Sequence, residues 1–207
     1  MQVVLASASP ARLSVLEAAG ITPHVVVSGV DEDAIAAALP APEPEHVVVA
    51  LAEAKAAAVL AEVTKSHPDC VVIGCDSMLH HNGELLGKPH TPEVARKRWA
   101  AMAGTTGDLL TGHAVLRVEQ GRRTASATGT QSTTVRFGTP TDAELDAYIA
   151  TKEPLKVAGA FTLDGLGGWF VEGIDGDPSS VIGISLPLTR RLLAEVGVTV
   201  DQLWSTT

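Results

Sequence analysis

This chain of 207 residues has few aromatic residues, few cysteines and no long apolar run. Aromatic residues make up only 3% of it although 45% is hydrophobic, so we expect a core built from small and β-branched side chains. No apolar run approaches the roughly 20 residues that span a bilayer, which predicts no membrane partner. No basic region precedes an apolar stretch at the N-terminus, so a secretory signal is not expected.

Positive charge is also scarce, with 15 Lys and Arg against 24 Asp and Glu and a formal net charge of -9. This balance argues against a protein that coats nucleic acid, because binding to the phosphate backbone needs an excess of cations. A small anionic ligand remains compatible, since a few clustered cations can form a local positive pocket. Cys70 and Cys75 are too close along one expected strand for an ordinary disulfide. They predict reduced, buried thiols in a cytoplasmic protein.

The order of expected elements indicates an α/β fold with a mixed sheet. Asn82-Gly83, between apolar residues, predicts a tight hairpin. No internal repeat or clear linker appears, so residues 1–207 are predicted to form one domain or two closely packed lobes. Strands are expected at 3–6, 25–27, 71–75, 108–118 and 125–137, and helices at 10–19, 46–65, 91–102, 141–150 and 186–196, with a short helix within 31–45.

The most informative stretch runs from Ile73 to Ser77 and is followed by Gly87-Lys88-Pro89. An apolar run here predicts a buried strand that stops at Asp76, and a buried negative charge is costly unless a cation meets it. The intervening hairpin brings Lys88 back toward the strand end, which is where open α/β sheets bind ligands. The alternative is a purely structural ion pair between Asp76 and Lys88.

Three further polar groups are candidates for an anion site. Ser9 and Arg12 lie where a strand gives way to a helix, and the free N–H groups of a helix N-terminus attract anions. The alternative is an ordinary Ser-Pro cap followed by a surface arginine. Lys55 lies in an otherwise apolar helix, so it either extends its ammonium to solvent at the helix edge or reaches an anion in a pocket.

The acidic run around Glu32 has two interpretations as well. Oxygen-only clusters suit Mg²⁺, which uses one or two carboxylates together with substrate phosphates; the alternative is a solvated loop. Zinc ligand spacings are missing from the histidines and cysteines. The sequence contains neither a G-x-S-x-G elbow nor a P-loop.

Taken in order, several segments resemble the Maf family of nucleoside triphosphate pyrophosphatases. The resemblance runs nearly from end to end, and the ordered set is specific although each piece alone is weak. The matching segments are Leu5-Ala-Ser-Ala-Ser-Pro-Ala-Arg12, Ser28-Gly-Val-Asp-Glu32, Leu51-Ala-Glu-Ala-Lys-Ala56, Gly74-Cys-Asp-Ser77, Gly87-Lys-Pro89, Ala158-Gly-Ala-Phe161, Asp164-Gly-Leu-Gly-Gly168 and Gly183-Ile-Ser-Leu-Pro-Leu188.

The resemblance implies a mixed, strongly twisted sheet flanked by helices, two lobes around a deep cleft, a homodimer and a divalent cation, Mg²⁺ or Mn²⁺. It implies cleavage of a nucleoside triphosphate between the α and β phosphates, giving a monophosphate and pyrophosphate. Asp76 matches the catalytic base or metal-organising carboxylate, and Glu32 matches a second acid that also holds the metal. The phosphate-binding positions of the family match Ser9, Arg12, Lys55 and Lys88.

Departures from the family pattern concern specificity. Ala11 stands where the family commonly has a second arginine. Asp164 stands where the branch acting on dTTP and UTP carries glutamine, and the branch acting on 7-methyl-GTP tends to carry an acid. Because a carboxylate only accepts hydrogen bonds, Asp164 is a candidate for recognising a base rich in donors. The segment Gly165-Leu166-Gly167-Gly168 resembles the first branch, so the preferred base stays open.

Two functions therefore compete. The first is metal-assisted hydrolysis of nucleoside triphosphates, in which Asp76 or Glu32 orients the attacking water while cations hold the phosphates. The second is a nucleotide-binding regulator of septum formation that acts through a partner without turnover. A poised carboxylate beside several cations favours hydrolysis, since binding alone does not require a base. A sugar-nucleotide transferase is a third interpretation, but this chain lacks the long glycine-rich N-terminal loop expected of such an enzyme.

Overall fold

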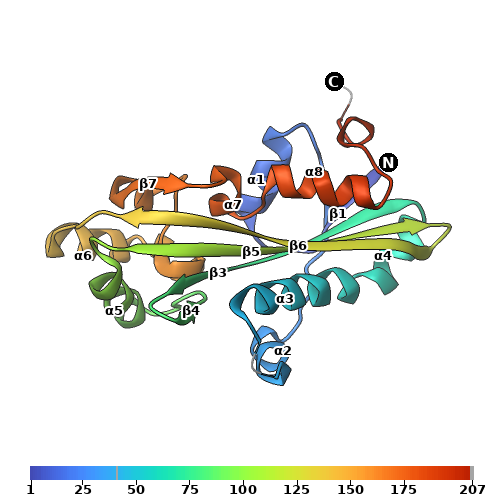
Figure 1. Ribbon diagram of the computed structural model, residues 1–207. Helices are drawn as coiled ribbons and strands as arrows, with labels where there is room; N and C mark the ends of the chain where they lie inside the picture. The colour runs from blue at the N-terminus through green and yellow to red at the C-terminus, as the bar shows by residue number, and fades with distance from the viewer. Residues whose placement is uncertain (41, 206–207) are drawn as a thin grey trace. The chain divides into compact units, whose positions relative to one another are not determined.

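The computed structural model describes residues 1–40 and 42–205 (Figure 1). Its strands are β1 (Gln2–Leu5), β2 (His24–Val25), β3 (Cys70–His81), β4 (Glu84–Leu86), β5 (Thr106–Glu119), β6 (Arg122–Phe137) and β7 (Val171–Asp175). Its α-helices are α1 (Pro10–Ala18), α2 (Glu32–Ala38), α3 (Pro44–Ala58), α4 (Leu60–Ser66), α5 (Pro92–Met102), α6 (Asp142–Ala150), α7 (Pro178–Ile182) and α8 (Leu186–Glu195). Short 3-10 helices span Glu153–Lys156, Ala158–Ala160, Leu166–Phe170 and Val200–Gln202.

The strands form a mixed sheet, which confirms the predicted α/β class. Its order is β2-β1-β3-β5-β6-β7, with β4 paired to β3. Strand β1 is parallel to both β2 and β3, whereas β4 is antiparallel to β3 and β7 is antiparallel to β6. The chain divides into two compact units, and each is described by itself. Unit 1 comprises residues 1–76, 111–131 and 183–207, and unit 2 comprises residues 77–110 and 132–182. The expected cleft between two lobes and the single-domain assignment stay predictions.

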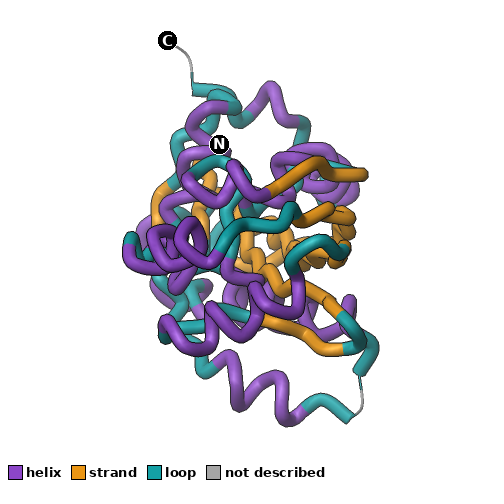
Figure 2. The backbone as a smooth tube through the Cα atoms, turned by 90° about the vertical axis from the view of Figure 1, so that its left-hand side faces the viewer, coloured by secondary structure: helices purple, strands orange, loops and turns teal. Residues whose placement is uncertain are grey.

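Unit 1 has helices on both faces of its strands (Figure 1), and Figure 2 colours the same backbone by helix, strand and loop. Side chains alternate along β3, so Val71, Ile73 and Cys75 join an aliphatic cluster with residues of α1 and α8. The intervening Val72 joins a second cluster on the opposite face, which contains residues of α3 and α4. Strand β3 is therefore buried on both sides, which explains why its sequence is a continuous apolar run rather than an alternating one.

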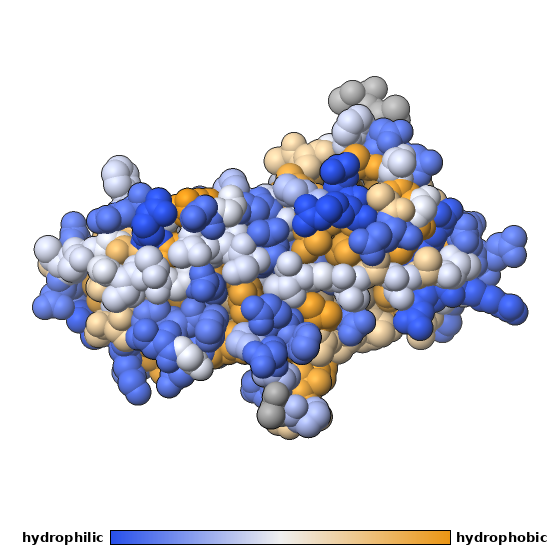
Figure 3. All heavy atoms as spheres, in the orientation of Figure 1, coloured by the Kyte–Doolittle hydropathy of each residue, from blue (hydrophilic) through white to orange (hydrophobic). Residues whose placement is uncertain are grey.

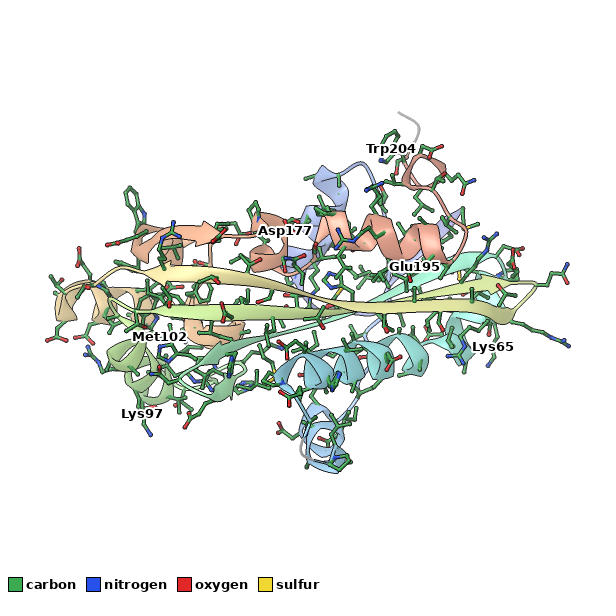
Figure 4. All side chains as sticks on the ribbon, viewed as in Figure 1. Lys65, Lys97, Met102, Asp177, Glu195 and Trp204 are labelled. Atoms are coloured by element: carbon green, nitrogen blue, oxygen red, sulfur yellow. The ribbon has the colours of Figure 1, made fainter. Side chains whose placement is uncertain are left out.

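Unit 2 has an aromatic core, which the low aromatic content did not predict. Trp99 of α5 is fully buried, and its indole Nε1 donates a hydrogen bond to Ala160 O at 2.8 Å. Its ring meets those of Phe137, Tyr148 and Phe170 edge-on at centroid distances between 5.8 and 6.3 Å. On the same helix, the exposed Lys97 points away from the strands (Figure 4). Helix α5 therefore presents one apolar face and one solvated face.

Two local expectations need correction, and a third is confirmed. Strand β3 does not stop at Asp76 but continues to His81, because its last residues pair with β4. The expected helix over 46–65 is two helices, interrupted at Val59, where φ is -88° and ψ is -10° while the side chain stays in the core. The predicted turn at Asn82-Gly83 is confirmed, with positive φ angles of 50° and 81° that suit a hairpin of this type.

The surface drawn in Figure 3 mixes hydrophilic and hydrophobic residues over the elements that face the viewer. Among the described residues, none of the helices combines the length and the apolar character needed to cross a membrane. Of the three tryptophans, Trp99 packs in the core, whereas Trp169 and Trp204 are 86% and 56% exposed.

Candidate active site

The first part of the site is the turn between β1 and α1 in unit 1. Pro10 occupies the first position of the helix, and Ser9 caps it by accepting a hydrogen bond from Arg12 N at 3.4 Å. Ser7 is buried, and its Oγ accepts hydrogen bonds from Ser9 N and from Arg12 Nη1, both at 3.1 Å. Ser7 thus ties the turn to the guanidinium that follows it.

Arg12 is oriented from a second direction by the turn before α8. The guanidinium is only 9% exposed, and its Nε donates a hydrogen bond to Gly183 O at 2.8 Å. Gly183 has a φ of 141°, and a Cβ at this position would lie 3.1 Å from Arg12 Cγ. The close approach of this backbone to Arg12 therefore depends on glycine. The alternative of a solvated surface arginine does not describe Arg12.

Close packing of α3 on the sheet brings Lys55 to its partners. A Cβ on Gly74 of β3 would overlap the carbonyl oxygen of Ala52 and come within 3.0 Å of the Ala56 side chain. A Cβ on Gly112 of β5 would likewise overlap the backbone of Val48. Two glycines thus let the backbone of α3 lie against the strands. The side chain of Lys55 is buried between α3 and the middle of β3.

The ammonium of Lys55 joins two carboxylates. Its Nζ lies 2.5 Å from Asp76 Oδ1 and 2.8 Å from Glu32 Oε1. The side chains of Lys55 and Asp76 are each 8% exposed, whereas that of Glu32 is 44% exposed. Asp31 caps α2 by accepting a hydrogen bond from Ala34 N at 2.9 Å, so the acidic run begins a helix and directs Glu32 toward the lysine. The observed partner of Asp76 is therefore Lys55 rather than Lys88.

Burial dominates the electrostatics of Asp76 and raises its pKa above the ordinary value of 3.8. The positive charges of Lys55 and Arg12 and the hydrogen bond from Lys55 lower this pKa, while the charge of Glu32 raises it. The neighbouring Cys75 is fully buried, and desolvation raises the pKa of its thiol to about 11 despite the same two cations. The site therefore holds a carboxylate with enhanced affinity for a proton beside two fixed positive charges.

The donor set can be compared with the needs of a divalent cation. Among residues 1–40 and 42–205, no group of three or more His, Cys, Asp and Glu side chains is placed to hold a metal ion by itself. Asp76 and Glu32 both contact the ammonium of Lys55, so their two carboxylates lie close to each other. Two carboxylates completed by substrate phosphates and water are a usual arrangement for Mg²⁺, so the residues fit such an ion.

Two predicted site residues belong to unit 2 and are described with it. Lys88 is exposed and follows Gly87, whose carbonyl accepts hydrogen bonds from Gly159 N at 3.3 Å and from Arg98 Nη1. Asp164 is exposed in the loop before the 3-10 helix Leu166–Phe170. The structure thus gathers Ser9, Arg12, Glu32, Lys55 and Asp76 within unit 1 and places Lys88 and Asp164 in unit 2.

The loop that carries Asp164 is held by one carboxylate. Glu153 Oε1 accepts hydrogen bonds from Thr162 Oγ1 at 2.5 Å and from Gly167 N at 3.1 Å. Desolvation acts to raise the pKa of Glu153, but the hydrogen bonds to its carboxylate together outweigh this effect and lower the pKa. The carboxylate therefore stays ionised and fixes the loop on both sides of Asp164.

Sequence reasoning did not single out three buried residues of unit 1. Ser7 lies inside the first motif, where a second hydroxyl before the helix cap was the available signal. Gly183 contributes only a backbone carbonyl, which no residue pattern reveals. His113 is fully buried in β5 and was set aside because no other histidine or cysteine stood at ligand spacing from it.

Comparisons with known proteins identify the family of this chain. The sequence model of the family described as Maf-like protein matches residues 2–196. A relative from Saccharopolyspora erythraea, named nucleoside triphosphate pyrophosphatase, is 65% identical over 99% of this chain and 97% of its own length. Relatives of the same name from Nocardia farcinica and Mycolicibacterium gilvum are 66% and 58% identical, over 97% and 98% of this chain and 95% and 98% of their own lengths. With a match that spans nearly every residue and the motifs in the expected order, the chain belongs to the Maf-like protein family.

Proposed function

We propose that this protein is a nucleoside triphosphate pyrophosphatase, which splits the bond between the α and β phosphates to give a nucleoside monophosphate and pyrophosphate. The observation that carries the proposal is the buried contact of Lys55 with Asp76 and Glu32, beside the buried Arg12. The names of the full-length relatives support the same activity.

The positive groups of the site suit a polyphosphate. Arg12 is held at its Nε and at one Nη by Gly183 and Ser7, so a bound phosphate meets a guanidinium whose orientation is already fixed. The ammonium of Lys55 is anchored between carboxylates and adds a second positive charge. In this proposal, Lys88 and the Ser9 hydroxyl complete the contacts to the phosphates.

Asp76 is assigned the role of general base. Because burial raises its pKa, the ionised carboxylate is a better proton acceptor than an exposed aspartate and can take a proton from the attacking water. Asp76 and Glu32 would hold a divalent cation, Mg²⁺ or Mn²⁺, which when bound neutralises part of the triphosphate charge. Lys55 keeps both carboxylates oriented before substrate arrives.

The alternative, a nucleotide-binding regulator without turnover, fits this site less well. Binding of a metal–triphosphate complex needs cations and carboxylates that hold the metal, but it does not require a buried carboxylate whose affinity for a proton is raised. A buried aspartate with a raised pKa is instead what acid–base chemistry uses.

Three finer assignments belong to the same proposal. Asp164 is assigned to recognition of the base, where an acceptor-only side chain favours a base edge with donor groups. A cytoplasmic location is supported by two free, buried cysteines, which suit a reducing compartment. Assembly as a homodimer rests on the family resemblance.

The experiment is a pyrophosphate-release assay over canonical and modified triphosphates, including dTTP, UTP, GTP and 7-methyl-GTP, with Mg²⁺ or Mn²⁺. We expect pyrophosphate and nucleoside monophosphate in equal amounts, identified by phosphorus NMR. Release of inorganic phosphate and a diphosphate would contradict the assigned bond. Tight binding of every triphosphate without turnover would favour the regulator.

A further inference from the structure

We propose that His113 is a positioning residue for Arg12, acting through the turn formed by residues 183–185; the inference rests on the proposed function of Arg12 in binding phosphate. The imidazole is fully buried in β5 and bridges a strand carbonyl and this turn. His113, Gly183, Ser185 and Arg12 all belong to unit 1.

Hydrogen bonds to both ring nitrogens define the state of His113. Ser185 N donates to His113 Nε2 at 2.8 Å, and because a backbone N–H can only donate, Nε2 must be the unprotonated nitrogen. Nδ1 lies 3.0 Å from Thr111 O, an acceptor, so it carries the proton. The ring is therefore the neutral tautomer with its proton on Nδ1, and it cannot be replaced by a group that only donates or only accepts.

The turn connects this imidazole to the guanidinium over three residues. Ser185 is bound to His113 through its N–H, and two residues earlier Gly183 O accepts the hydrogen bond from Arg12 Nε at 2.8 Å. On the other side of the turn, Ser185 Oγ caps α8 by accepting from Leu188 N at 3.1 Å. The position of the Gly183 carbonyl is therefore set by His113 on one side and by the start of α8 on the other.

Burial makes the contact between His113 and Ser185 costly to lose. His113, Ile184 and Ser185 are all 0% exposed, so water has no direct access to a freed Ser185 N–H. An unpaired buried donor is unfavourable, and the backbone of the turn would shift to find another partner. Because Gly183 O is two residues away, that shift would move the acceptor that orients Arg12.

Two amide substitutions separate the two contacts of the ring. In His113→Gln the amide reaches the position of Nε2 and still offers an oxygen to Ser185 N–H. In His113→Asn the amide reaches only the position of Nδ1, so the bond to Thr111 O survives and the acceptor for Ser185 is lost. We expect His113→Asn to lower kcat/KM by about tenfold or more, as expected for a small displacement of a phosphate-binding group, and His113→Gln to restore most of it.

A double-mutant cycle with Arg12→Ala tests whether the effect passes through Arg12. If His113 acts by positioning Arg12, His113→Asn should change kcat/KM by less than about twofold once Arg12 is absent. Leu192→Ala is the matched control, since it loosens the packing of α8 in the same core. It leaves in place the hydrogen bonds from Ser185 N to His113 Nε2 and from Arg12 Nε to Gly183 O. An equal loss from His113→Asn with and without Arg12 would overturn the proposal.

Solvent exchange of the Arg12 Nε–H, followed by NMR, gives a readout independent of activity. The signal is assigned by its loss in Arg12→Lys. We expect protection of this proton in the wild-type protein, in Leu192→Ala and in His113→Gln, and faster exchange in His113→Asn. Unchanged protection of this proton in a folded His113→Asn protein would refute the inference, whatever the activity of that protein. If His113→Asn does not fold, loss of protection in His113→Gln refutes the inference.

The exchange experiment also separates the inference from the proposed function. If the protein lacks pyrophosphatase activity but the Arg12 Nε–H is protected in the wild type and in His113→Gln and exchanges faster in His113→Asn, only the proposed function is refuted.

Discussion

The two units bury different kinds of side chain. The two clusters of unit 1 are aliphatic, and its buried polar residues include Arg12, Lys55, Asp76 and His113. The cluster of unit 2 contains Trp99, Phe137, Tyr148 and Phe161, with Phe170 packed against it. Most of the few aromatic residues of the chain are thus concentrated in the unit that does not contain the buried charges.

This difference shows two ways of fixing side chains. In unit 2, large rings supply apolar area and edge-on contacts that stabilise the core. In unit 1, glycines and alanines let helix and strand backbones come together, so that charged side chains meet partners at fixed positions. We infer that the core of unit 2 contributes chiefly to stability, whereas the core of unit 1 also holds in place the buried charged residues that we assign to catalysis.

The largest expected effect comes from Asp76→Asn, which should lower kcat about a thousandfold because an amide can neither accept the proton nor carry the charge. The shape of the side chain is preserved, so the thermal midpoint should not fall. Pyrophosphate release measures the loss, and Glu53→Gln, an exposed position on the same helix as Lys55, serves as the control. Turnover close to the wild-type rate would show that Asp76 is not the base.

Trp99→Ala should produce the largest loss of stability, about 3–5 kcal/mol, because it leaves a cavity in the aromatic core. Urea unfolding followed by circular dichroism measures this change. Trp169→Ala is the matched control, since that indole is 86% exposed and its removal should change the unfolding free energy by less than about 0.5 kcal/mol. Equal effects of the two changes would contradict the assignment of unit 2 as an aromatic core.

Gly74→Ala should cost about 1–3 kcal/mol, because the added methyl group meets the backbone of α3 rather than a movable side chain. Displacement of α3 should also separate Lys55 from Asp76 and reduce turnover in the protein that remains folded. Gly129→Ala adds the same group to a strand of unit 1, but there the nearest atom is Leu188 Cδ1 at 3.2 Å, the end of a flexible side chain. A smaller loss from Gly129→Ala is the expected outcome in urea unfolding; the reverse order would contradict it.

The raised pKa of Asp76 predicts opposite pH dependences of activity and stability. The acid limb of kcat/KM should lie above the ordinary carboxyl value of 3.8, since the base must be ionised. The folded protein binds this proton more tightly than the unfolded chain, so the contribution of Asp76 to stability is present at low pH and is lost as pH rises through the raised value. In Asp76→Asn this dependence should vanish, which pH titration of the thermal midpoint can check. An acid limb at or below 3.8 would contradict the prediction.

The smallest expected effect is a change of preference rather than of rate. Asp164→Gln adds a donor to the exposed loop of unit 2, so the ratio of kcat/KM for dTTP and UTP to that for guanine triphosphates should rise. Asp175→Asn, another exposed carboxylate of unit 2, is a suitable control. Identical ratios across the nucleotide panel would exclude base recognition by Asp164.

Much of the fold followed from local patterns in the sequence. The cap at Ser9, the helices expected over 91–102 and 141–150, and the Asn82-Gly83 turn were identifiable because each depends on local side-chain or backbone requirements. The continuation of β3 beyond Asp76 was not identifiable, because it depends on pairing with β4. The aromatic core of unit 2 was missed because composition averages over the whole chain.

For the site, residue types were easier to predict than partners. Arg12, Glu32, Lys55 and Asp76 lie close together in unit 1, whereas their role in a site stays a prediction. The sequence interpretation paired Asp76 with the lysine that a hairpin brings back rather than with Lys55. The true partner depends on how closely α3 approaches the strands, which Gly74 and Gly112 determine through tertiary contact. The segment that begins at Gly183 was part of the family pattern, but nothing in it indicated that the Gly183 carbonyl accepts a hydrogen bond from Arg12.

The two buried thiols have a practical consequence. Cys70 and Cys75 are both 0% exposed, and burial raises the pKa of each to about 11, so at neutral pH neither presents a thiolate to reagents. A cysteine introduced at an exposed position would then be the site at which maleimide probes react. Fluorophores or spin labels could be attached one at a time to the native protein, and substrate-induced motion followed without first removing its own sulfhydryl groups.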